Sequence, residues 1–198
     1  MRVIAGSLRS RRLCAPSGQQ TRPTHDRVKE ALFSMLGNIS GKNVADLYAG
    51  TGALGIEALS RGALHACFVE RARDALACLR RNLQDLGLDE SSTVIARSLE
   101  SAGNEVSQRG PYDLLFCDPP WKSLTEVGVT LNRLRLEQWL TPTGLFILEH
   151  PAKFDAATLH LEGLTLEDRR HWGDTGITLF GAGNTPQAMP KELPSTPS

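Results

Sequence analysis

A single stretch, from Tyr112 to Trp121, most constrains how this chain can fold. It begins as a short apolar run, which is typical of a strand buried in a parallel sheet. It continues as Asp118-Pro119-Pro120-Trp121. Because proline lacks a backbone N–H donor and has a fixed φ, the two prolines cannot continue a central strand. The chain must therefore leave the sheet at Asp118, at the carboxyl end of a strand, where open α/β sheets place their ligands.

The loop after this strand carries groups that can hold a planar molecule bearing an amine. Trp121 offers a flat ring for stacking, and the Asp118 carboxylate and the Pro119 carbonyl can accept N–H bonds. A proline turn that packs a buried tryptophan would explain the same four residues without any ligand. The rest of the chain has to separate these two interpretations.

A glycine-rich loop follows the first strand expected in the main sheet, residues 43–48. The loop reads Gly50-Thr51-Gly52-Ala53-Leu54-Gly55, it leads into a helix, and the next strand, residues 67–69, is followed by Glu70. In this G-x-G-x-x-G arrangement glycine allows a tight turn and close approach of a ligand to the backbone. An acid in the position of Glu70 can accept both ribose hydroxyls of a nucleoside. The alternative is a surface acid beside Arg71 and Arg73.

Two ligand classes fit a strand, glycine loop and helix of this kind: a dinucleotide such as NAD, and S-adenosylmethionine (SAM). Dinucleotide folds seat a pyrophosphate at the N-terminus of the helix. Asp46, within the first strand and directed toward the loop, would repel a pyrophosphate but attract a cationic sulfonium or ammonium group. Asp46 therefore favours SAM, and so does the Asp118 loop on the fourth strand.

The remaining periodicity alternates between strands and helices, so we predict an α/β fold with a doubly wound, Rossmann-like sheet. An antiparallel hairpin, formed by residues 164–170 and 177–180, is expected at its end. The other expected elements are helices at 24–36, 76–86 and 124–140, a weak helix within 101–110, and strands at 93–96 and 145–148.

Composition places the chain among ordinary single-domain globular proteins. It has 198 residues, 40% of them hydrophobic, and a mean hydropathy of −0.23. We find neither a run long enough to span a bilayer nor a secretory signal, so we expect a cytoplasmic protein. The four cysteines (Cys14, Cys67, Cys78 and Cys117) form no C-x-x-C pair, and we expect reduced thiols and no metal site.

The net charge of zero hides a basic N-terminal part. The first 42 residues carry eight basic and two acidic side chains, which leaves 14 basic and 20 acidic in the rest. We divide the chain into a basic extension (1–40, a hairpin of residues 2–5 and 12–15 followed by a helix), a main domain (41–181) and a disordered tail (182–198). Positive charge at the start of that helix opposes its dipole and suggests an external anion, unless the surface is simply solvated. The candidate residues for binding a polyanionic partner, such as RNA, are Arg9, Arg11, Arg12, Arg22, Arg27 and Lys29.

Several motifs together resemble one family. The order Asp46, Gly50-Thr51-Gly52, Glu70 and Asp118-Pro119-Pro120-Trp121 is similar to that of class I SAM-dependent amino-methyltransferases. The segments Arg2-Val3-Ile4-Ala5-Gly6, Arg22-Pro23-Thr24-His25-Asp26-Arg27-Val28 and Leu54-Gly55-Ile56-Glu57-Ala58-Leu59-Ser60-Arg61-Gly62-Ala63 resemble the bacterial 16S ribosomal RNA guanine-N2 methyltransferases. The resemblance covers residues 1 to about 180. It implies a seven-stranded sheet with the last strand antiparallel.

The resemblance also implies an activity, SAM-dependent methylation of the exocyclic N2 amine of guanine 966 in 16S ribosomal RNA. Its partner would be that RNA, in an assembling or assembled small subunit, and we expect a monomer. The implied catalytic residues are Asp118, Pro119, Pro120 and Trp121. The implied cofactor-binding residues are Asp46, Tyr48, Gly50, Thr51, Gly52, Gly55, Glu70, Ser98, Leu99 and Asp118.

The sequence departs from the family at three positions. The family usually has glycine where Ser10 stands, a small hydroxyl residue at His25, and an acid that binds the adenine amine near Ser98. Here Ser98, or the backbone N–H of Leu99, would serve for adenine. The same fold could also methylate adenine or cytosine in DNA, or a protein glutamine. A non-catalytic RNA-binding assembly factor and an NAD-dependent oxidoreductase are the alternatives from other classes.

Overall fold

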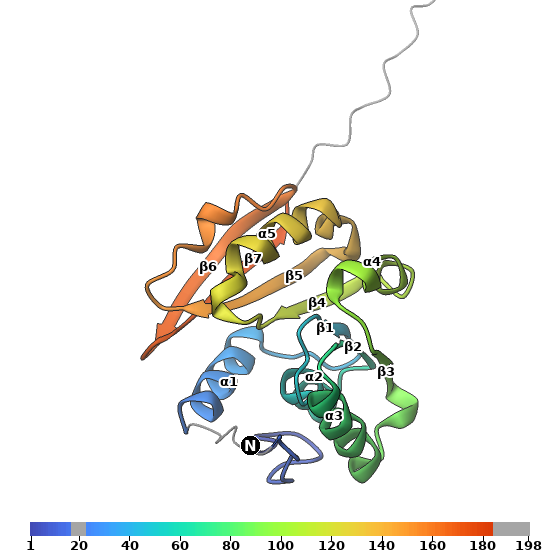
Figure 1. The fold of residues 1–198 in the computed structure, drawn as a ribbon. Helices are drawn as coiled ribbons and strands as arrows, with labels where there is room; N and C mark the ends of the chain where they lie inside the picture. Colours follow the sequence, from blue (N-terminus) through green and yellow to red (C-terminus); the bar gives the residue numbers. More distant parts are fainter. Residues whose placement is uncertain (17–22, 184–198) are drawn as a thin grey trace, which may run out of the picture.

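The computed structural model describes residues 1–16 and 23–183, which form one seven-stranded sheet (Figure 1). The strand order is β3-β2-β1-β4-β5-β7-β6, with β1 to β5 parallel and β7 antiparallel to both of its neighbours. This confirms the predicted α/β fold and its antiparallel last strand. The strands are β1 (Asn43–Asp46), β2 (His65–Val69), β3 (Ser92–Ile95), β4 (Tyr112–Cys117), β5 (Leu140–Pro151), β6 (Leu164–Trp172) and β7 (Thr175–Ala182).

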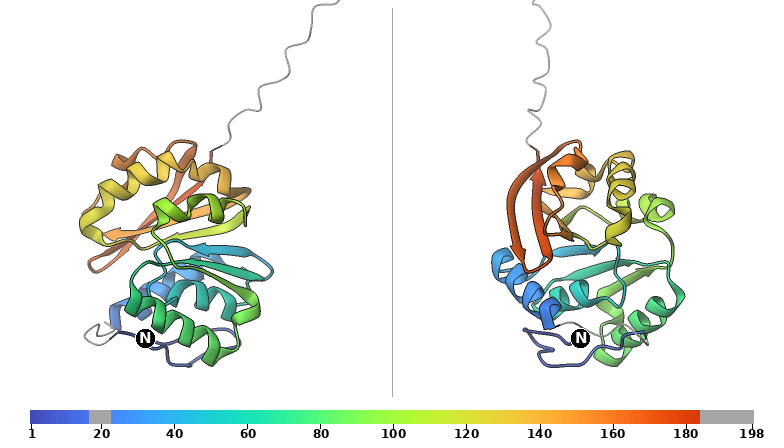
Figure 2. Two further views of the ribbon diagram at one scale, coloured as in Figure 1. Left: turned by 45° about the vertical axis from the view of Figure 1, so that its right-hand side comes forward. Right: turned by 60° about the vertical axis from the view of Figure 1, so that its left-hand side comes forward.

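Helices cover both faces of the sheet (Figure 2). One face carries α1 (Pro23–Leu36), α2 (Ala53–Ser60) and α3 (Arg73–Leu86), and the other carries α4 (Leu99–Ser107) and α5 (Leu124–Arg133). Four 3-10 helices complete the described chain: η1 (Asp89–Ser91), η2 (Trp121–Ser123), η3 (Leu136–Trp139) and η4 (Ala156–Leu159). Successive side chains of a strand point to opposite faces of the sheet, so they pack alternately into the two hydrophobic cores. Ala45 and Leu115 face α4 and α5, whereas Val44 and Leu114 face α1 to α3.

The predicted elements are present, but some bounds differ. The helix expected to run to residue 140 ends at Arg133, and Arg135 adopts φ +55° before η3 begins. The strand expected at 145–148 starts earlier, at Leu140, and passes through a register shift opposite Tyr112 and Leu114. A bulge lets a strand tolerate proline and glycine, here Pro142 and Gly144. Within the described residues, no helix has the length and apolarity to cross a bilayer.

The N-terminal arm, residues 1–16, is less regular than the hairpin predicted from the sequence. Instead of two strands it has one antiparallel bridge, between Arg2 and Arg12. Val3 N donates to Arg11 O (2.9 Å), and Ser10 N donates to Val3 O (2.9 Å). Val3 and Leu13 are buried in the same core as α1, α2 and α3. The arm is therefore packed against the main domain, while residues 184–198 of the predicted tail lie outside the described residues.

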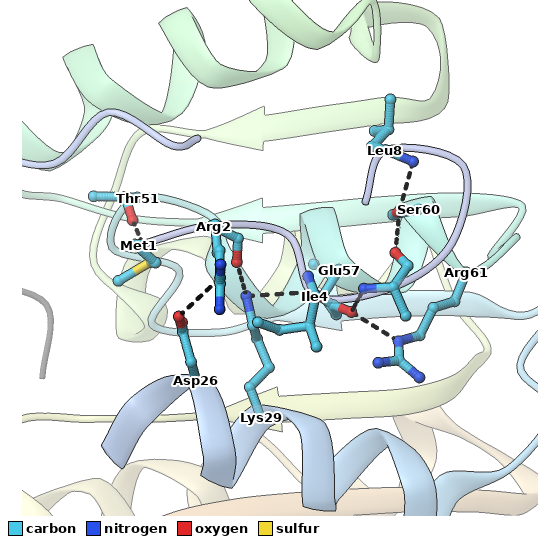
Figure 3. Close-up of polar contacts among 12 residues, drawn as sticks. Met1, Arg2, Ile4, Leu8, Asp26, Lys29, Thr51, Glu57, Ser60 and Arg61 are labelled. Carbon is cyan, nitrogen blue, oxygen red and sulfur yellow. Dashed lines mark hydrogen bonds and ion pairs between the residues drawn. The ribbon is translucent and has the colours of Figure 1, made fainter. Parts of the chain in front are cut away.

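Glu57 of α2 fixes this arm in place (Figure 3). Its carboxylate is fully buried and accepts from the backbone N–H groups of Ile4 (2.7 Å) and Ala5 (3.0 Å). It also pairs with Arg61 Nε (2.8 Å) and with Lys29 Nζ (3.3 Å), and Lys29 donates to Arg2 O (2.7 Å). Lys29 is 5% exposed, so the prediction that it binds RNA is wrong. The positive charge at the start of α1 suggested an external anion. For Lys29 the anion is instead the Glu57 carboxylate of the protein itself.

Candidate active site

A cleft of about 870 Å³ lies at the carboxyl ends of β1, β2 and β4. The loops that follow these strands and the start of α4 form its walls, as expected at the point where strand order reverses. Eleven of the predicted site residues line it: Asp46, Tyr48, Gly50, Thr51, Glu70, Ser98, Leu99, Asp118, Pro119, Pro120 and Trp121. The glycine loop and the Asp118 loop, which are far apart in sequence, therefore line one cavity.

Gly52 and Gly55 were predicted to bind the cofactor, but neither lines the cleft. Gly52 has φ +84°, and a Cβ there would lie 2.5 Å from Leu79 Cδ1. A Cβ on Gly55 would lie 2.3 Å from the Phe68 ring. These glycines let α2 pack closely on β2 and α3, so they determine the conformation of the loop from the side that faces away from the cleft. Gly50 has open space at its Cβ position and faces the cleft.

Asp46 ends β1 as a buried acid, only 1% exposed. One oxygen accepts the N–H of Gly55 (3.1 Å), which ties the strand end to the start of α2. Burial is the largest cause of a raised pKa at Asp46. The Gly55 N–H bond opposes the rise, the charges of Asp118 and Glu70 add to it, and the resulting pKa is about 7. A cation bound in the cleft would favour the ionised form.

Glu70 lies at the end of β2 and holds the two cleft loops together. Its Oε2 accepts the N–H of Gly50 (2.8 Å), and its Oε1 accepts the N–H groups of Arg71 (2.6 Å) and Ala72 (2.7 Å). A carboxylate has about four acceptor sites, so these three bonds leave capacity for a ligand hydroxyl. Glu70 is thus more than the surface acid that the sequence allowed as an alternative.

Asp118, the residue after β4, is partly exposed into the cleft, and burial raises its pKa to about 6. Pro119 is buried, whereas Trp121 is 38% exposed at the start of η2. The interpretation of this segment as a turn around a buried tryptophan is therefore wrong. An acid, a backbone carbonyl and an accessible indole ring share the wall of one cavity.

On the opposite wall, Ser98 precedes α4 and Leu99 begins it. The Ser98 hydroxyl lies 2.9 Å from the Ser101 hydroxyl. The first backbone N–H groups of a helix have no partner within the helix, so the start of α4 offers donors to the cleft. This position is consistent with the predicted role in binding adenine, which stays a prediction.

The structure places the other candidate RNA-binding residues differently from Lys29. Arg9, Arg12 and Arg27 are exposed, and Arg11 is exposed while donating to Asp85 O (3.3 Å). Arg22 lies outside the described residues. Met1 and Ala15 line the cleft, which sequence reasoning missed because nothing in the pattern indicated that the N-terminal arm reaches the strand ends. Other missed lining residues include Arg71, Glu100, Glu126 and Thr130.

The strand order, the antiparallel β7 and the cleft at the strand ends define the class I methyltransferase fold. A Geobacter metallireducens precorrin-6y C5,15-methyltransferase shares it at a TM-score of 0.61 and 16% identity, over 87% of this chain and 93% of that one. The chain belongs to the family described as conserved hypothetical protein 95, whose model matches residues 1–181.

Individual relatives support this assignment. Ribosomal RNA small subunit methyltransferase D of Haemophilus influenzae is 36% identical over 183 residues, covering 91% of this chain and 93% of that protein. The Escherichia coli K12 protein of the same name is 36% identical over 152 residues, covering 75% and 74%. A solved structure of a hypothetical protein from Thermus thermophilus superposes with a TM-score of 0.73 at 28% identity, over 90% of this chain and 98% of that one.

Proposed function

We propose that this protein transfers a methyl group from SAM to the exocyclic N2 amine of a guanine, guanine 966, in 16S ribosomal RNA. One observation carries the proposal: the Asp118 loop lies in the same cavity as the glycine loop and Glu70. Relatives of similar length are named ribosomal RNA small subunit methyltransferases, which favours ribosomal RNA over DNA or a protein glutamine. No observation on the described residues of the cleft favours a second function.

The cleft residues fit SAM by their chemistry. Glu70 can accept the ribose hydroxyls, and the start of α4 can donate to adenine. Asp46 is a buried acid without an ion-pair partner among the described residues, so a cationic sulfonium or ammonium nearby would offset the cost of its charge. When bound, SAM supplies an electrophilic methyl group on its sulfonium.

The protein's own residues would prepare the amine. The guanine N2 nitrogen is conjugated with its ring and is a poor nucleophile. Asp118 and the Pro119 carbonyl would each accept one of its N–H bonds and favour a pyramidal nitrogen whose lone pair points at the methyl group. As the new N–C bond forms and the S–C bond breaks, the nitrogen becomes acidic, and Asp118, with its pKa near 6, can take the proton. Trp121 would stack on the extruded base.

The test uses ribosomal RNA from a strain that lacks the gene. Mass spectrometry of its nucleosides should show N2-methylguanosine reduced in 16S RNA, and the purified protein with SAM should restore it on free RNA or on small subunits. Loss of a methylated adenine or cytosine instead would favour the corresponding alternative. Unchanged RNA with normal SAM binding would contradict the proposed substrate, and NAD binding without SAM binding would contradict the cofactor.

A further inference from the structure

Glu149 is a buried acid beside Asp118 that sequence reasoning identified only as the end of a strand. In the register of β4 and β5, Cys117 pairs with Leu148, so Asp118, just beyond β4, lies next to Glu149, which is still within β5. Cys117 and Leu148 both face the core under α4 and α5. Because side chains alternate, Asp118 and Glu149 turn to the opposite face, toward α1 and α2.

A second cavity of about 70 Å³ confirms that these two acids share a space. Asp118 and Glu149 both line it, together with Leu54 of α2 and Lys29 of α1. Asp118 and Leu54 also line the main cleft, so the smaller cavity continues the cleft beyond Asp118. It is large enough for the polar edge of a base, whereas the ring itself would stay in the main cleft beside Trp121.

Glu149 is 9% exposed, and its carboxyl has no hydrogen-bond or ion-pair partner among the residues whose side chains the structure describes, 1–16 and 26–183. Lys29 lines the same cavity, but its ammonium group is committed to Glu57 (3.3 Å) and to Arg2 O (2.7 Å). Burial, and then the charge of Asp118, raise the pKa of Glu149 well above its ordinary value. A buried acid without a partner costs stability, and a ligand that donates an N–H bond would reduce that cost.

We propose that Glu149 accepts the N1–H of the guanine whose N2 amine lies at Asp118, and so selects guanine over other amine-bearing bases. The inference rests on the proposed function. In guanine the ring nitrogen N1, next to the carbon that bears the amine, carries a proton. In adenine and cytosine the ring nitrogen next to the amine-bearing carbon carries a lone pair instead. A bound N1–H favours the ionised form of Glu149, and an ionised carboxylate beside Asp118 bonds guanine and repels the ring lone pair of the other two bases.

A base analogue tests this without changing the protein. 2-Aminopurine keeps the 2-amine of guanine, but its N1 carries a lone pair. Small-subunit RNA with either base at the target position, free and assembled into particles, is incubated with the protein and SAM. Loss of one hydrogen bond to a charged acceptor predicts at least a roughly tenfold lower kcat/KM for 2-aminopurine. Equal rates for the two bases would overturn the inference.

Glu149→Gln then assigns this selectivity to the residue. Its amide N–H can donate to the N1 lone pair of 2-aminopurine, so the preference for guanine should shrink severalfold while SAM affinity, measured by calorimetry, stays unchanged. Glu90→Gln, the same change at an exposed residue that lines neither cavity, should leave the preference intact. An unchanged preference in Glu149→Gln would refute the inference. If no guanine RNA is methylated by the unmodified protein, the proposed function has failed instead.

Discussion

Two sets of buried or half-buried acids lie on the same side of the sheet, and they differ in how many hydrogen bonds and ion pairs their oxygens make. Glu57 accepts two backbone N–H groups and pairs with Lys29 and Arg61. The acids around the cleft have much less: Asp46 accepts one N–H, and Asp118 and Glu149 have no partner among the residues whose side chains are described. A satisfied carboxylate stabilises the fold, whereas an unsatisfied one is a cost that a ligand can offset. The contrast separates an acid that holds the arm from acids placed for chemistry.

The largest expected effect is on turnover at the unsatisfied set. Asp118→Ala removes an acceptor of the amine protons, so we expect methyl transfer to fall by about 10²–10⁴-fold. SAM affinity should stay nearly unchanged in calorimetry, and stability in urea should stay the same or rise because a buried acid has gone. Near-normal turnover would show that Asp118 is not the amine acceptor. The unsatisfied acids would then have no demonstrated role in catalysis.

The satisfied set should respond in stability. Glu57→Ala leaves the Lys29 ammonium buried without its anion, and we expect a loss of about 3–5 kcal/mol in urea unfolding. Glu105 provides a matched control, because it too pairs with two basic side chains, Arg97 (3.2 Å) and Arg109 (3.3 Å), but near the surface. Glu105→Ala should cost about 1 kcal/mol or less. Similar losses in the two variants would mean that burial does not distinguish the Glu57 network.

The sequence contained part of this contrast. The apolar run before Asp118, the glycine loop and Glu70 predicted the sheet and the cleft, because each is a local pattern that can be read from consecutive residues. The pairing of Lys29 with Glu57 joins residues 28 positions apart in sequence, and no local pattern shows it. A signal did exist: Lys29 precedes Leu32, Phe33 and Leu36 at helical spacing, on the apolar stripe itself.

Other features depended on tertiary contacts. Gly52 and Gly55 were predicted to be needed as glycines, but for contact with the cofactor. They are needed because side chains of α3 and β2 approach them closely, which no local pattern shows. Glu149 was identified as a strand end without a role, since its relation to Asp118 requires the register of β4 and β5.

The pH dependence of stability offers a third test of the unsatisfied set. The pKa of Asp46 is about 7 in the folded protein and about 4 when unfolded, so the folded state keeps a proton that the unfolded state has released. Stability from this group therefore falls as pH rises from about 4 to about 7, and is level above that.

Asp46→Asn removes the titration while its amide oxygen can still accept the Gly55 N–H. Relative to the unmodified protein, the variant should gain about 2–4 kcal/mol between pH 4 and pH 7. Urea unfolding at several pH values measures this gain. SAM affinity of the unmodified protein should rise through pH 7 as Asp46 ionises. A constant difference between the two proteins would show that folding does not shift the pKa of Asp46.

A smaller effect is expected from the exposed charges that the docked arm carries. Replacing Arg9, Arg11 and Arg12 with alanine should lower the salt slope of RNA binding by about one unit for each phosphate that these arginines bind. Lys29→Met should cost stability and leave the slope alone, because Lys29 is buried. The control triple variant, Arg135, Arg169 and Arg170 to alanine, removes equal charge from exposed sites before η3 and on the edge strand β6. Equal slopes for the two triple variants would argue against the arm as the RNA-binding surface.

The smallest effect concerns the backbone of the arm itself. Ser10 has φ +69°, the left-handed region that favours glycine, and its N–H donates to Val3 O (2.9 Å). The family resemblance places a glycine there, so Ser10→Gly should relieve local strain, partly offset by the greater freedom of glycine in the unfolded chain. We expect a net gain of about 0.5–1 kcal/mol in urea unfolding. Ser34→Gly, at an exposed position inside α1, should instead lose about 0.5 kcal/mol. If the arm is held as firmly as the Glu57 contacts indicate, the gain from Ser10→Gly appears in the free energy of global unfolding. If the arm opens separately, Ser10→Gly changes only local amide exchange. That second result would show that the arm is not rigidly docked.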